Sequence, residues 1–228
     1  MNIEEVHLLT NDLDQTEVFY SQILNFPVSG RSAFHRSFRV GPSTLTFCLT
    51  QECRPFYHFA FGVPASHLQD AYRWLAARTP LLPFSAAGWI ADFDNWNAQA
   101  FYFHDPAGNI LELIAHRDLP DSNRPFSPAA ISEIREIGIP VDEVVTERER
   151  ICREYGLSYF RKGPVLDAFT AVGDDRGLLI LTKAGRGWLP TGRPAEKHPL
   201  TVRFSVGDET YLMKVGHENL VEPQFTTI

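Results

Sequence analysis

The chain has 228 residues, of which 44% are hydrophobic, and its formal net charge is -7. This length suffices for one large or two small globular domains, and the apolar runs are far shorter than the roughly 20 residues that span a membrane. Lys and Arg form no cluster of the kind that binds nucleic acid, and the N-terminus lacks the layout of a secretory signal. The composition favours a cytoplasmic protein that binds neither nucleic acid nor membrane.

One order of elements recurs along the chain. The hydrophobic spacing predicts a strand over 2–10 with a helix over 11–26, then a strand over 55–63 with a helix over 66–78, and the order restarts with a strand over 131–141. The remaining expected elements are a helix over 142–156 and shorter strands at about 34–40, 44–50, 87–92, 99–104, 109–115, 158–162, 167–173, 177–183 and 200–206. The chain therefore repeats a strand, a helix and up to three strands, and a fourth copy ends short.

Local signals mark the ends of the predicted helices. Asn11 or Asp12 can cap the first helix, and Ser66 with Gln69 has the spacing of a capping box at the second. Gly156 stands where the third helix is expected to end.

A single unit of this size is unlikely to bury its own sheet, so we expect units to pack in pairs. The stretch 117–128 is rich in Pro and Asp and is typical of a linker. The sequence therefore predicts an α+β fold of tandem βαβββ units in two domains, 1–118 and 129–228, each built from two consecutive units.

One position of the repeat carries polar residues. Aligning the first strands of the units matches His7 with His58 and with Gly138, and the apolar strand "NILELIA" contains the single carboxylate Glu112. Burying a carboxylate costs several kcal/mol unless a partner offsets it. Two imidazoles and a carboxylate form a triad that leaves metal positions open for a substrate. The pattern predicts a divalent metal at His7, His58 and Glu112; the alternative is that both histidines are ordinary core residues.

These residues resemble the vicinal oxygen chelate superfamily, which includes glyoxalases, bleomycin-resistance and fosfomycin-resistance proteins and extradiol dioxygenases. The segment 11–26 is similar to the family's "D…FY…LGF" helix, and "FYFHDPAGNILEL" is similar to its closing hairpin. The resemblance is strong over 1–118 and weaker beyond. It implies cup-shaped mixed sheets, Fe(II), Mn(II) or Zn(II) at the predicted triad, and a small-molecule substrate whose adjacent oxygens chelate the metal.

The closing hairpin is most similar to that of extradiol dioxygenases. The resemblance implies that Tyr102 is a catalytic residue that hydrogen-bonds a metal-bound oxygen, although a packing role is the alternative. The signature also places a His at about 93–95, where this chain has Phe, Asp and Asn. A glyoxalase-type or fosfomycin-resistance-type lyase or transferase, and a non-catalytic binding protein of the bleomycin-resistance kind, therefore stay open.

The second predicted domain lacks the ligands of the first, because Gly138 has no side chain to bind a metal. We expect 129–228 to stabilise the first domain, to line its pocket or to form a dimer contact. The chain is expected to be a monomer or a homodimer, with the metal ligands converging within one chain or across two.

Overall fold

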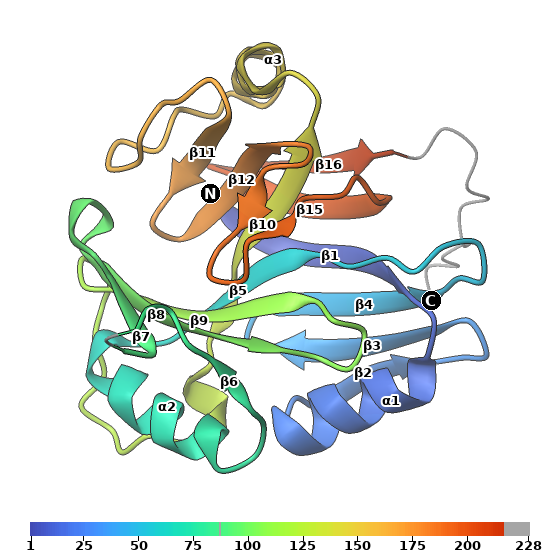
Figure 1. Cartoon of the computed structure of the whole chain (residues 1–228), viewed down its shortest axis with the longest axis vertical. Coiled ribbons are helices and arrows are strands. Elements are labelled where there is room, and N and C mark those ends of the chain that lie inside the picture. The colour runs from blue at the N-terminus through green and yellow to red at the C-terminus, as the bar shows by residue number, and fades with distance from the viewer. Residues whose placement is uncertain (87, 217–228) are drawn as a thin grey trace.

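Most strands of the protein lie in two sheets, as a computed structural model shows (Figure 1). The structure describes residues 1–86 and 88–216. The six-stranded sheet has the order β16 (Glu209–Val215), β15 (Leu200–Val206), β1 (Asn2–Thr10), β4 (Ser43–Leu49), β3 (His35–Val40) and β2 (Val28–Arg31). The eight-stranded sheet has the order β11 (Phe169–Asp174), β12 (Gly177–Lys183), β10 (Glu133–Val141), β5 (His58–Gly62), β9 (Ile110–His116), β8 (Ala98–His104) and β6 (Leu81–Leu82), and β7 (Ile90–Phe93) also pairs with β8.

The helices are few and lie outside the sheets. In Figure 1, α1 and α2 lie at the bottom of the view and α3 at the top, with the sheets between them. The helical elements are α1 (Leu13–Val18) continuing into the π-helical η1 (Phe19–Ile23), α2 (Leu68–Ala76), α3 (Val144–Tyr155), and the short 3₁₀ turns η2 (Ala65–His67), η3 (Asp94–Trp96) and η4 (Pro128–Ala130). A separate two-stranded ribbon joins β13 (Gly187–Trp188) to β14 (Arg193–Pro194). The predicted α+β class, with its repeated βαβββ order, is confirmed.

The units pair through their first strands. In the six-stranded sheet β1 pairs antiparallel with β15, and in the eight-stranded sheet β5 pairs antiparallel with β10. The first unit therefore shares a sheet with the fourth and the second with the third, whereas the first and second units meet through side-chain contacts such as Phe26 on Phe61. The first strand of each unit has a free edge that can pair with the first strand of any other unit. The sequence of one unit does not specify which strand pairs there.

Each sheet takes strands from both sides of the predicted boundary at 119–128. The division into the domains 1–118 and 129–228 remains a prediction. Its last twelve residues, 217–228, lie outside the described residues.

One apolar core joins both sheets and all three helices. Alternate residues of β5, Phe59 and Phe61, are fully buried on the core face of their strand. Phe61 meets Phe26, which follows η1, in an edge-to-face contact with ring centroids 5.1 Å apart. In α2 the buried residues Leu68, Ala71 and Leu75 fall on one side of the helix, as in an amphipathic helix that covers a core. The other residues of β5, including His58, face the opposite side of the sheet.

Two of the three predicted helix ends are confirmed. The carboxylate of Asp12 accepts hydrogen bonds from the backbone N–H groups of Asp14 and Gln15, at 3.0 and 2.9 Å. Gly156 ends α3 in the left-handed conformation, with φ at +65°. The capping box at Ser66 is wrong, because its hydroxyl donates to Asp121 at 2.7 Å instead of capping α2.

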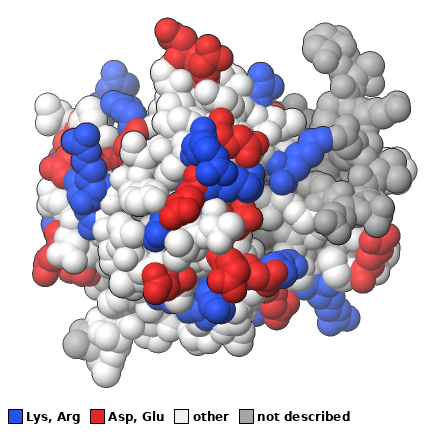
Figure 2. All heavy atoms as spheres, turned by 90° about the horizontal axis from the view of Figure 1, so that it is seen from above, with Lys and Arg blue, Asp and Glu red and all other residues white. Residues whose placement is uncertain are grey.

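The surface carries charges of both signs. On the face seen in Figure 2, acidic and basic side chains are intermingled and do not separate into patches of one sign. Across the described residues, no helix has the length and apolar character needed to cross a membrane.

Candidate metal centre

Three ionisable side chains meet on one face of the eight-stranded sheet. His58, Glu112 and Glu136 each offer a ligand atom, and these atoms all lie within 4.8 Å of one another. Ala60 explains the convergence, because the strand register puts it opposite Glu112 on one side and opposite Glu136 on the other. His58 precedes Ala60 by two residues and therefore points to the same face. We call this face, which also carries Tyr102, the site face.

The two carboxyl groups are held in a dry environment. Glu112 and Glu136 are each 3% exposed. Burial raises the pKa of Glu136 to about 8, and burial together with the neighbouring Glu136 raises the pKa of Glu112 well above its usual value. Among the described residues, the Oε1 atom of Glu136 has no hydrogen-bond partner. A buried acceptor without a partner, beside a second carboxyl group, fits a bound cation.

The imidazole of His58 is oriented as a metal ligand would be. Its Nδ1 atom lies 3.0 Å from the carbonyl oxygen of Ile110. Because a carbonyl only accepts, Nδ1 carries the proton and Nε2 keeps its lone pair. Nε2 lies 3.7 Å from a carboxylate oxygen of Glu112, too far for a hydrogen bond. Burial lowers the pKa of His58 to about 4, so the ring is neutral at pH 7, as metal binding requires.

Tyr102 lies beside the cluster. It stands opposite Glu112 in the pairing of β8 with β9, and its hydroxyl group hydrogen-bonds that carboxyl group. Burial, and then the two nearby carboxyl groups, raise the pKa of Tyr102 well above its usual value. The ring stacks on Phe84 with centroids 6.2 Å apart. The structure therefore brings Tyr102 and Glu112 together, as the closing-hairpin motif predicts.

The structure does not bring His7 to this centre. His7 lies on β1, in the other sheet, and its Nε2 atom is 2.7 Å from a carboxylate oxygen of Glu5. The predicted convergence of His7 with His58 and Glu112 required the first strands of the first two units to meet. Because β5 pairs with β10 instead, Glu136 takes the third place.

Glu136 was missed although a signal for it existed. It directly precedes the apolar run "IGIPV" and is one of two carboxylates in β10, the other being Glu133 at the start of the strand. The unexplained burial of a carboxylate, which singled out Glu112, applies to Glu136 as well. Aligning the repeat on the histidine position drew attention to Gly138 instead.

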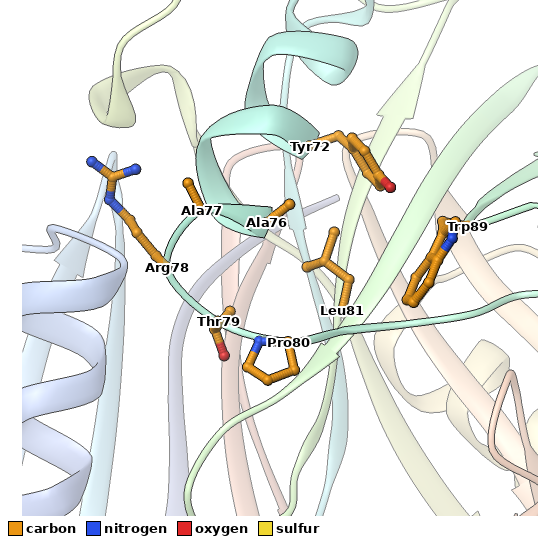
Figure 3. Close-up of a pocket in the computed structure, with 8 residues that line it drawn as sticks. All are labelled: Tyr72, Ala76, Ala77, Arg78, Thr79, Pro80, Leu81 and Trp89. Atoms are coloured by element: carbon orange, nitrogen blue, oxygen red, sulfur yellow. The ribbon is translucent and has the colours of Figure 1, made fainter.

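A surface hollow of about 480 Å³ lies away from the centre (Figure 3). It lies beyond the end of α2, where Tyr72 and Trp89 border it and Arg78 extends away from Trp89. It shares no lining residue with the His58 cluster. A narrow crevice borders His58 instead.

Comparison with solved structures places this architecture among known folds. A candidate dioxygenase from Bacillus subtilis superposes with a TM-score of 0.59 at 16% identity, over 80% of this chain and 63% of that one. Glyoxalase I from Zea mays gives 0.53 at 15% identity, over 80% and 66%. A glyoxalase/bleomycin resistance protein/dioxygenase from Alicyclobacillus acidocaldarius gives 0.43 at 18% identity, over 51% and 92%. No protein-family model and no curated protein matches the sequence.

The chain has the fold of the candidate Bacillus dioxygenase structure and of maize glyoxalase I, which is the fold that the vicinal oxygen chelate resemblance implies. The resemblance inferred from the sequence is confirmed in this respect. The chain spans slightly less than two thirds of the Bacillus and maize proteins, so their activities bear on it only as proposals.

Proposed function

We propose that this chain is a divalent-metal-dependent enzyme that acts on a small molecule with adjacent oxygens, and that His58, Glu112 and Glu136 hold the metal. The observation that carries the proposal is the pair of buried carboxyl groups flanking Ala60, one with an unpartnered oxygen, beside a neutral imidazole. A cation is the simplest partner that offsets the burial of both carboxylates.

The proposed ligand set is richer in oxygen than the one predicted from sequence. It has one imidazole and two carboxylates in place of two imidazoles and one carboxylate. Carboxylate oxygens suit Mn(II) better than Zn(II), whereas imidazole suits Zn(II) and Fe(II). Among Fe(II), Mn(II) and Zn(II), replacing one imidazole ligand by a carboxylate therefore favours Mn(II).

The residues around the cluster have definable roles. The metal, when bound, supplies Lewis-acid or redox chemistry to the oxygens it chelates. The carbonyl of Ile110 fixes the His58 ring, and Tyr102 keeps its proton at neutral pH, so that its hydroxyl can donate to Glu112 or to a substrate oxygen nearby. Phe56 and Trp188 are almost fully buried beside the cluster and exclude water from it.

The reaction we favour is a dioxygenase-like oxidation, because Tyr102 stands beside a ligand carboxylate as the closing-hairpin motif implies. A lyase or transferase of the glyoxalase or fosfomycin-resistance kind, and a binding protein without turnover, are the alternatives. Oxygen uptake with a panel of catechols under Fe(II) distinguishes them: uptake supports the oxidation, and its absence in a metal-loaded protein argues against it.

Metal titration tests the proposed function. We expect about one Mn(II), Fe(II) or Zn(II) per chain by calorimetry, with at least a tenfold loss of affinity in His58→Ala. His104→Ala is the matched control, since His104 ends the neighbouring strand β8 and bonds the backbone of Asn109. The proposal is wrong if no metal binds stoichiometrically, or if the two variants bind it equally well.

A further inference from the structure

A narrow crevice borders His58 of the cluster. It is lined by Phe56, Tyr57, His58, Gly138, Pro140, Trp188, Glu196 and His198. The largest of these side chains, Trp188, is only 4% exposed. Its ring lies against the His58 imidazole, with centroids 4.8 Å apart and planes tilted by 43°.

Gly138 makes the room for this indole. A Cβ atom at position 138 would lie 2.7 Å from the indole Cη2 of Trp188 and 3.0 Å from the carbonyl oxygen of His58. Any larger residue would therefore push the ring out of the crevice. Gly138 occupies the repeat position at which His7 and His58 stand in the first two units. Its lack of a side chain leaves the space that the Trp188 indole fills.

The element that carries Trp188 is weakly attached to the rest of the fold. The ribbon Gly187–Pro194 has its own two-residue ladder and a turn bond from Gly192 to the carbonyl of Trp188. Within the described part of the chain, no backbone hydrogen bond joins this ribbon to a strand of the eight-stranded sheet. Segments with few such bonds open at low free-energy cost.

Arg193 supplies the main contacts of the ribbon besides Trp188 itself. Its guanidinium donates to the carbonyl of Gly108 at 3.1 Å and lies 3.3 Å from the ring centroid of Phe56. Gly108 belongs to the same closing hairpin as Glu112. Backbone bonds between Ala195 and the residues Gly185 and Arg186 hold the base of the ribbon, and the Trp188 indole and the Arg193 guanidinium hold its body against the crevice.

We propose that Trp188 is a removable plug over the His58 cluster, and that outward movement of Gly187–Pro194 admits ligands to it. The space vacated by the indole selects a flat ligand of similar size. The role of the plug in metal and substrate access rests on the proposed function, whereas the shielding of His58 does not.

Chemical modification of the metal-free full chain tests the shielding. Diethyl pyrocarbonate modifies accessible neutral imidazoles, and peptide mass spectrometry assigns each site. We expect His58 to react at least tenfold faster in Trp188→Ala and in Arg193→Ala than in the wild type. Leu189→Ala is the matched control, because Leu189 lies in the same ribbon and is 50% exposed. His116, whose side chain is fully buried, must stay protected in every variant, which excludes unfolding as the cause.

Metal exchange then tests access to the centre. With Mn(II) bound, removal by excess EDTA should be at least tenfold faster in Trp188→Ala and Arg193→Ala, and unchanged in Leu189→Ala. Equal reactivity of His58 in the wild type and both opening variants overturns the plug, whether or not metal binds. If Mn(II) binds no variant while His58 becomes reactive as expected, the plug stands and the proposed metal function fails.

Discussion

Ala60 determines the composition of the candidate centre. Glu112 and Glu136 lie opposite Ala60 on the two neighbouring strands. Both carboxyl groups therefore flank the Ala60 side chain, a single methyl group that leaves space for them. Two carboxyl groups this close and this dry cannot both ionise without a positive partner. The proposed divalent cation would supply that charge, and among the described residues the Oε1 atom of Glu136 has no other partner.

His116 gives the metal-free protein a stability that depends on pH. Burial, and then the nearby Arg135 guanidinium, lower the pKa of His116 to about 4, below the 6.5 of an ordinary histidine. The unfolded chain therefore takes up the proton first as the pH falls. This contribution to the free energy of unfolding is fully present above about pH 6.5 and is lost toward pH 4. About 2 kcal/mol of it is already lost at pH 5.

His116→Gln removes this titration and keeps a neutral polar group. The free energy of unfolding in urea should then fall by about 2 kcal/mol less between pH 7 and pH 5 than it does in the wild type. His58 has a pKa lowered in the same direction, so some pH dependence remains. A variant whose stability falls as steeply as that of the wild type would refute the assignment to His116.

Site residues could be predicted from the sequence where the strand that carries them was enough to single them out. His58 and Glu112 were found because each is polar within an apolar strand, and both lie at the centre. The third member of the candidate centre depends on which strand pairs with the free edge of β5, and no residue near His58 encodes that choice. The sequence therefore assigned His7 to the site, although β1 lies in the other sheet, and overlooked Glu136.

Turns between strands bring the two sheets together, and Gly41 is the tightest of these contacts. It turns β3 into β4 with φ at +56°, and a Cβ atom there would lie 1.7 Å from the carbonyl oxygen of Ser132. Ser132 immediately precedes β10 and donates its backbone N–H to Gly62 at 2.9 Å. The turn of the six-stranded sheet thus touches the start of the strand that carries Glu136.

Gly41→Ala should lower the free energy of unfolding by at least about 3 kcal/mol, since backbone strain and a backbone clash add together. Gly207→Ala is the matched control, because Gly207 turns β15 into β16 with φ at +60° and nothing lies within 4 Å of its Cβ position. The control should lose only about 1 kcal/mol. Equal losses in thermal or urea unfolding would contradict the close approach of Gly41 to Ser132.

The elements themselves were largely predictable because their signals are local. The helix over 11–26 appears as α1 and η1, and Asp12 caps it as its position indicates. The capping box at Ser66 failed because Asp121, far along the chain, offers the hydroxyl a better acceptor. Local patterns thus identify helices and strands, whereas contacts between distant segments decide which side chains cap the helix ends.

At the scale of the whole molecule, one core serves both sheets. Tyr155 of α3 packs edge to face on Phe204 of β15, with centroids 5.4 Å apart. The helix α3 connects two strands of the eight-stranded sheet, whereas β15 lies in the six-stranded sheet. The hydroxyl group of Tyr20 in η1 donates to Asp105, in the turn between β8 and β9, at 2.8 Å. Such contacts link each half of the chain to both sheets.

We therefore expect the full chain to unfold in urea as one cooperative transition, with tryptophan fluorescence and far-ultraviolet circular dichroism changing together. A fragment spanning 1–118 leaves the edges of β1 and β5 unpaired and should not fold as a monomer. Two separate transitions, one of them reproduced by the fragment, would instead support the predicted division into independent domains.

The most direct test of the account is the metal affinity of two single variants, Glu136→Gln and His7→Ala, measured by Mn(II) titration of the full chain. Glu136→Gln nearly preserves shape and removes one ligand charge, so we expect at least a tenfold weaker affinity. His7→Ala should bind Mn(II) as the wild type does, because His7 lies in the other sheet. The reverse result, with His7→Ala losing the metal and Glu136→Gln keeping it, would contradict the assigned centre.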